Sequence, residues 1–270
     1  QKGRLVDIFD KTQNVKTTKV DSFSSKITAS SITAKRISIR NNKFRLMVNG
    51  EEIDSSDSTH LDVVIINASP HVHRMYYDTE YIPGVRVQPP VCWSSNSVTP
   101  DSKVQQPQNS MCGECPQNAK GSGPRGTKAC RFSRRIAVLK ADDLNGDVYQ
   151  VTLPAQSIFG KGTADRKPLH QYTDYVRANN QNLISIVSRM SFDMNAPNTK
   201  IGFQAIKIIN DEEYDVCAKK STSDEAKRAI ELTVHVNSED TTNVFKPIEQ
   251  KSAVADSGEI DLETLLSAWH

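Results

Sequence analysis

The chain has 270 residues, 37% of them hydrophobic, and a formal net charge of +2 at pH 7. This length can bury a sizeable core, and the absence of any apolar run near about eighteen residues argues against a membrane span. No charged-then-apolar leader is seen, so the composition favours a soluble, non-secreted protein.

The small net charge conceals opposite charges at the two ends. Residues 1–47 hold eleven Lys or Arg against three Asp, which predicts a basic, flexible arm at residues 1–31. Residues 248–270 are predicted to form an acidic tail that replication or transcription proteins could bind. The candidate partner-binding residues of this tail are Asp256, Glu259, Asp261, Glu263 and Trp269. An ordinary frayed terminus is the alternative.

Alternating apolar residues predict paired strands at residues 32–39 and 44–48, with a turn at Asn41-Asn42. The continuous apolar run 61–68 predicts a central strand. The outer faces of the first two strands form either a solvated surface or a track for phosphates. Their basic side chains are Lys35, Arg36, Arg40, Lys43 and Arg45.

Three tyrosines, Tyr76, Tyr77 and Tyr81, follow the central strand and lie close to Arg74 in the sequence. Aromatic rings of this kind stack on nucleic-acid bases. The cluster is therefore a candidate stacking platform.

Four of the five cysteines lie in residues 92–130, at Cys92, Cys112, Cys115 and Cys130. The C-x-x-C pair, with Gly113 for backbone freedom, could bind one ion from a tight turn, and the outer cysteines would complete a tetrahedron. The segment has few large apolar residues, so a cross-link must hold it. We predict a structural zinc site; an iron–sulfur cluster, disulfides and free thiols are the alternatives. Four thiolates leave no open position for water, which disfavours a catalytic metal.

From Cys115 to Lys140, inclusive, there are seven basic residues and no acidic one. Rings beside cations suit single-stranded nucleic acid, because bases stack and phosphates pair with Arg and Lys. Besides the tyrosines, the candidate nucleic-acid-binding residues are Arg125, Lys128, Arg131, Phe132, Arg134 and Arg135. The alternative is a structural knuckle with a solvated basic loop, in which Trp93 covers the metal.

The remaining pattern predicts a hairpin at residues 135–139 and 148–153, a helix at 168–180, strands at 183–192 and 200–209, and helices at 211–220 and 223–230. In the first helix, Tyr175 is expected on the same packing face as Tyr172 and Val176. The expected fold is mainly β or α+β. It is an OB-fold-like barrel over residues 32–247, with a zinc-knuckle insertion at 92–130 and a few peripheral helices.

Several segments carry a resemblance: PPVCWSSNSVTPDS, CGECPQN, GTKACRFSRRIAVL, LPAQSIFG and SFDMNAPNTKIGFQAI. Over about residues 37–209 they resemble uncharacterised bacteriophage proteins encoded among replication genes. The design is also similar to phage helix-destabilising proteins, which combine an OB-fold, a zinc knuckle, a basic arm and an acidic tail. Those knuckles include a histidine ligand, whereas this chain offers four cysteines.

The leading functional prediction is a bacteriophage protein that binds single-stranded DNA without reading sequence and protects replication and recombination intermediates in the host cytoplasm. The alternatives are a zinc-containing adaptor for a viral or host polymerase and a virion protein. An enzyme is not expected, because the candidate carboxylates form no recognisable acid–base pair. These carboxylates are Asp62, Asp78, Glu80, Asp174 and Asp193.

Overall fold

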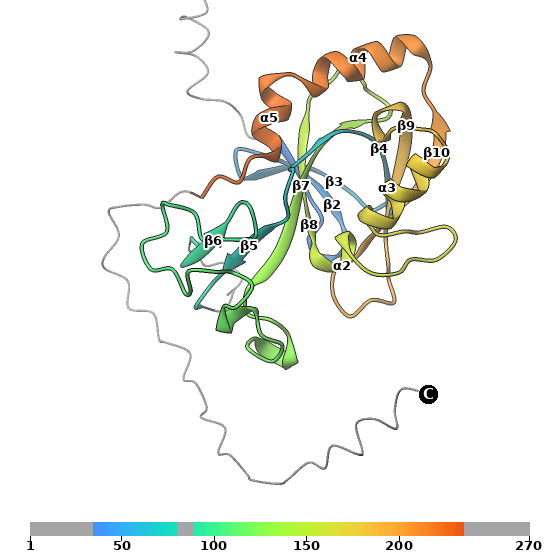
Figure 1. The fold of residues 1–270 in the computed structure, drawn as a ribbon. Helices are drawn as coiled ribbons and strands as arrows, with labels where there is room; N and C mark the ends of the chain where they lie inside the picture. The colour runs from blue at the N-terminus through green and yellow to red at the C-terminus, as the bar shows by residue number, and fades with distance from the viewer. Residues whose placement is uncertain (1–34, 80–88, 235–270) are drawn as a thin grey trace, which may run out of the picture. The chain divides into compact units, whose positions relative to one another are not determined.

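The computed structural model describes residues 35–79 and 89–234 and divides the chain into two compact units (Figure 1). Among the described residues, the first unit comprises residues 35–70 and 134–231, and the second comprises residues 71–79, 89–133 and 232–234. The basic arm, Tyr81 and the acidic tail predicted from the sequence lie outside the described residues.

The first unit is built on a curled sheet that forms a half-barrel (Figure 1). Among the described residues, its eight strands follow the order β10-β9-β4-β7-β8-β1-β2-β3. Their bounds are β1 Lys35–Ser38, β2 Phe44–Val48, β3 Glu51–Ser56, β4 His60–Ala68, β7 Arg131–Lys140, β8 Tyr149–Pro154, β9 Ile186–Phe192 and β10 Ile201–Ile208. The prediction of a mainly β or α+β fold with few helices is confirmed.

Asparagine-containing turns set the register of the first three strands. Asn41 and Asn42 between β1 and β2 have φ of 56° and 53°, and Asn49 and Gly50 between β2 and β3 have φ of 52° and 91°. Positive φ at both central residues gives the turn twist that matches paired strands, and Asn and Gly adopt it most readily. Both hairpins are antiparallel, whereas β1 pairs with β8 in parallel.

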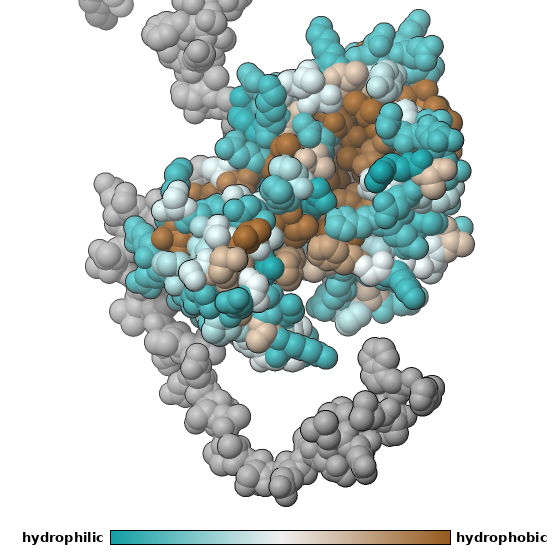
Figure 2. Space-filling model, viewed as in Figure 1, coloured by the Kyte–Doolittle hydropathy of each residue, from teal (hydrophilic) through white to brown (hydrophobic). Residues whose placement is uncertain are grey.

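The core lies on both faces of the sheet. The described helices are α2 (Ala155–Ile158), α3 (Leu169–Ala178), α4 (Asp211–Ser221) and α5 (Asp224–Ile230). Val64 of β4 packs in a cluster with residues of α4 and α5, whereas Tyr172 of α3 bonds to Ser188 of β9 at 2.7 Å and stacks on Phe203 of β10. Figure 2 shows hydrophobic residues between α4 and α3 and hydrophilic residues over both helices. None of the helices in the described ranges is both long and apolar enough to span a bilayer.

Three of the five basic side chains in and beside β1 and β2 pair with carboxylates. Lys35 pairs with Asp147, Lys43 pairs with Asp57 at 2.8 Å, and Arg45 pairs with Glu52 at 3.4 Å. These pairs neutralise much of the charge that a phosphate track would need. The structure therefore favours a solvated surface here.

The second unit is held by a small antiparallel sheet. Its strands are β5 (His73–Tyr76), β6 (Cys92–Ser94) and the first residues of β7. Trp93, only 6% exposed, forms a small core with Val104 and is packed by Met75, Leu232 and Val234. The described remainder is loops and short 3-10 turns at Pro116–Asn118 and Pro124–Gly126, which agrees with the low apolar content of this segment.

Candidate metal and nucleic-acid site

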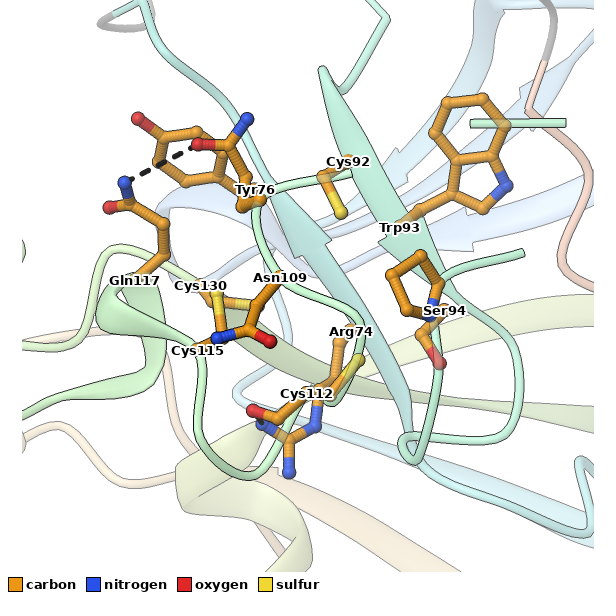
Figure 3. A pocket seen from close by; sticks show the side chains of 12 residues that line it. Arg74, Tyr76, Cys92, Trp93, Ser94, Asn109, Cys112, Cys115, Gln117 and Cys130 are labelled. Atoms are coloured by element: carbon orange, nitrogen blue, oxygen red, sulfur yellow. Dashed lines mark hydrogen bonds between the residues drawn. The ribbon is translucent and has the colours of Figure 1, made fainter. Parts of the chain in front are cut away.

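The cysteine site lies on one face of the second unit's sheet. Arg74 is the cross-strand neighbour of both Ser94 and Phe132, and Tyr76 is the neighbour of Cys92. Because side chains alternate along a strand, these residues share a face, and Cys130, two residues before Phe132, belongs to it as well. Trp93 is directed to the opposite face, and Figure 3 shows its ring pointing away from the cysteines.

A cavity of about 20 Å³ opens on this face and is lined by all four predicted metal ligands (Figure 3). Cys92 comes from β6, Cys130 from the entry to β7, and Cys112 and Cys115 from the loop that covers the face. The space is close to that of one bound water and so suits a single small occupant. The other lining residues are Arg74, Tyr76, Trp93, Ser94, Pro100, Gln108, Asn109 and Gln117.

Main-chain hydrogen bonds hold the covering loop in place. The amide of Cys112 donates to the Val98 carbonyl at 2.8 Å, and the amide of Cys130 donates to the Gln117 carbonyl at 2.8 Å. The amide of Asn118 donates to the Cys115 carbonyl at 2.8 Å. The backbone at three of the four cysteines is thus fixed by bonds that do not involve the thiols.

All five cysteines fall in the described ranges, and all are free thiols. Burial raises the pKa of Cys130 to about 11, against an opposing effect of Arg74, and burial also raises the pKa of Cys92. A soft metal ion would have to displace these protons. In the described part of the chain, no group of three or more His, Cys, Asp or Glu side chains has the arrangement of a formed metal site.

Arg74 connects the cysteine cavity with the aromatic residue beside it. Its Nη1 donates to the carbonyl oxygen of Cys112 at 3.1 Å, and its guanidinium carbon lies 4.4 Å from the ring centre of Phe132. Its buried Nε has no hydrogen-bond partner among the described residues. The Lys128 ammonium also lies over the Phe132 ring, at 5.6 Å. Phe132 thus contacts both a lining residue of the cavity and the basic loop.

The predicted tyrosines do not form one platform in the described residues. Tyr76 lines the cavity, whereas the hydroxyl of Tyr77 contacts the sulfur of Met75 at 3.7 Å. Tyr81 lies outside the described residues. Trp93 is part of the small core of the second unit, as the structural alternative proposed.

The predicted arginines fall into two groups. Arg125 and Arg131 are exposed in the second unit, and Arg125 has a left-handed φ of 56°. Arg134 and Arg135 belong to the first unit, where they donate to main-chain carbonyls: Arg134 to Ser69 at 2.7 Å, and Arg135 to Glu231. Burial lowers the pKa of Arg134. These two side chains therefore serve the fold of the first unit.

Sequence reasoning left Arg74 out of the site, although it noted this residue beside the tyrosines. Arg74 and Tyr76 are two residues apart on β5 and therefore share a face, and this spacing could have indicated that Arg74 belongs to the site. Gly113 was expected to supply a special backbone conformation, but it lacks a left-handed φ, and a Cβ there would meet nothing within 4 Å. The tight approach lies instead at Gly123, where a Cβ would come within 2.8 Å of the backbone of Lys128 and Ala129.

No protein-family model matches the chain, and no curated protein or solved structure matches it.

Proposed function

We propose that this protein binds single-stranded DNA without sequence preference and protects it in phage replication and recombination. One structural zinc ion, held by Cys92, Cys112, Cys115 and Cys130, would order the second unit. The OB-fold-like character inferred from the strand pattern is part of the proposal, and the curled sheet of the first unit is compatible with it.

The donor chemistry and the shared cavity support the metal. Four sulfur ligands are the set that structural zinc sites use, and here they come from three separate segments around one space. Metal binding requires the thiol side chains to turn inward and lose their protons. The polar loops of this unit have little apolar core of their own, so such a cross-link would contribute directly to its folding.

The observation that carries the nucleic-acid proposal is the arrangement of Arg74, Lys128 and Phe132. A ring beside two cations, in the same unit as the exposed Arg125 and Arg131, would combine a stacking surface with phosphate partners. Arg134 and Arg135 are left out of this surface because carbonyl oxygens occupy their guanidinium groups.

The test is a fluorescence titration of oligothymidine with the full-length protein at low salt, with duplex DNA for comparison. Phe132→Ala and Lys128→Gln should each weaken binding, by about tenfold for the ring and less for the lysine. Lys219→Gln, at an exposed lysine of α4 in the first unit, is the matched control and should bind as the wild type does. A wild-type chain that does not bind at low salt would overturn the proposal and favour the polymerase adaptor.

A further inference from the structure

The first unit exposes two aromatic rings near α3. Phe159, which follows α2, is 40% exposed, and Tyr175 of α3 is 45% exposed. The helical pattern predicted Tyr175 on the packing face with Tyr172, but Tyr172 is buried and Tyr175 is not. Neither ring contributes to the packed core.

Phe159 is ordered by an exposed histidine and a fixed cation. Its ring meets His170 edge-on, with ring centres 4.9 Å apart and an angle of 86° between the planes. Nη1 of Arg134 lies 3.0 Å from Nε2 of His170, while its Nε and Nη2 donate to the Ser69 carbonyl. Because arginine can only donate, His170 accepts through Nε2. Its pKa is lowered by partial burial and by Arg134, which agrees with a neutral ring.

Tyr175 lies beneath a second cation. The ammonium of Lys167 is 4.7 Å from the centre of the Tyr175 ring. The main chain of Lys167 is fixed by reciprocal hydrogen bonds to Phe203 at 3.0 and 2.8 Å, and the Gly162 amide donates to Gln171 of α3 at 2.7 Å. The loop between the rings is therefore tied to both the sheet and the helix.

The charge around these rings favours an anion. Residues 159–177 carry Lys161, Arg166, Lys167 and Arg177 against Asp165 and Asp174. Tyr214 makes an instructive contrast, because it is 38% exposed on α4 but follows an acidic first turn of Asp211, Glu212 and Glu213. Exposed rings with excess cations are the combination that single-stranded nucleic acid requires.

We propose that the segment from Phe159 to Tyr175, here called the α2–α3 surface, is a second contact surface for single-stranded nucleic acid. Phe159 and Tyr175 stack on bases, and Lys161 pairs with phosphates. Lys167, whose ammonium also donates to the Ala164 carbonyl, holds the Tyr175 ring in place. The choice of ligand rests on the function proposed above, but the residues lie entirely in the first unit and can be tested separately from Phe132 and Lys128.

The test measures oligothymidine affinity of the full-length Phe159→Ala/Tyr175→Ala variant, with Tyr214→Ala as the matched control. We expect the double variant to bind about tenfold or more weakly and the control to bind within about twofold of wild type. Lys161→Gln should make the slope of log affinity against log salt about 0.7 less steep. All altered side chains are exposed, so thermal denaturation should show unchanged folding.

The outcomes separate this inference from the proposed function. If the wild type fails to bind at low salt, both fall. If the wild type binds and the ring variants match Tyr214→Ala, the α2–α3 surface is wrong, whatever Phe132→Ala does. An equal loss of duplex and single-strand binding would contradict base stacking by these rings. If the ring variants lose oligothymidine affinity and Phe132→Ala does not, the α2–α3 surface is retained and the surface at Phe132 in the second unit is wrong.

Discussion

Gly123 is the residue at which the basic loop of the second unit is most tightly constrained. Its amide and that of Gly121 both donate to the Thr127 carbonyl, at 2.8 and 3.1 Å, and so close the loop. This geometry brings the backbone of Gly123 against that of Lys128 and Ala129. The position of Lys128 over Phe132 depends on this closure.

We predict that Gly123→Ala opens the loop and that Gly113→Ala is tolerated. The added methyl at Gly123 would meet backbone atoms at 2.8 Å, whereas the methyl at Gly113 would meet open space. Relieving this steric clash requires a shift of the loop, at a cost of about 1–3 kcal/mol in the free energy of unfolding. Chemical denaturation of both variants checks this, and equal stability of the two would contradict it.

Asp62 and Arg189 join β4 to β9 through a paired contact, with N–O distances of 2.7 and 2.8 Å. The hydrogen bond from Arg189 holds the pKa of Asp62 below its usual value. The folded state therefore binds fewer protons at this group than the unfolded state. The stabilisation that this pair gives the folded state is present above the usual carboxyl pKa of about 4. It is lost as the pH falls through the lower pKa of Asp62 in the folded state.

We predict that Asp62→Asn destabilises the chain by roughly 1 kcal/mol at pH 7, since the pair is partly exposed. Below about pH 3 the difference from wild type should shrink, because the wild-type carboxyl is then protonated. Denaturation curves at several pH values measure this. A difference that stays constant, or grows as the pH falls, would contradict the assignment.

At the scale of elements, the loop that carries Cys112 and Cys115 decides whether the second unit has a metal site. Cys217 offers a control, because it is buried in α4 of the first unit, whereas the four cysteines belong to the second unit. A zinc ion on the four cysteines should be independent of it.

We predict that Cys112→Ser or Cys115→Ser lowers the zinc content from one ion per chain towards zero, while Cys217→Ser retains it. Atomic absorption on purified protein, with native mass spectrometry for stoichiometry, measures the difference. Iron in place of zinc would indicate the cluster alternative. Equal metal content in all the variants would exclude the four-cysteine site.

Most strands of the first unit could be predicted from the sequence. The apolar run 61–68 predicted β4, and the patterns of apolar residues elsewhere predicted the β1–β2 and β7–β8 pairs and the strands β9 and β10, because burial controls these residues. β3, with the sequence EEIDSS, was missed because all its residues but Ile53 are polar and almost all are exposed. The Asn49-Gly50 turn and pairing with β2 create that strand. Short β5 and β6 depend in the same way on cross-strand partners.

The sequence predicted the grouping of the four cysteines but not the contacts of the arginines. Cysteine spacing alone indicated that four thiols would meet, and they line one cavity. Arg134 and Arg135 looked like part of a basic patch, but their partners, the carbonyls of Ser69 and Glu231, lie far away in the sequence. Contacts of this kind appear only once the fold is known.

At the scale of the whole molecule, the proposal assigns the two units different tasks. The second unit contributes a ring and cations ordered by metal, and the α2–α3 surface of the first contributes rings ordered by main-chain contacts. Loss of metal should therefore weaken nucleic-acid binding without unfolding the first unit, whose core is independent of the cysteines in the cavity.

The most direct test compares oligothymidine affinity of the zinc-loaded protein and of the same protein stripped by a chelator, across a salt series. We predict tight, salt-steep binding by the loaded form, a loss of about tenfold or more on stripping, and recovery when zinc is restored. Circular dichroism should show that the first unit's sheet persists. Equal binding by both forms, or no binding by the loaded form at low salt, would contradict the account.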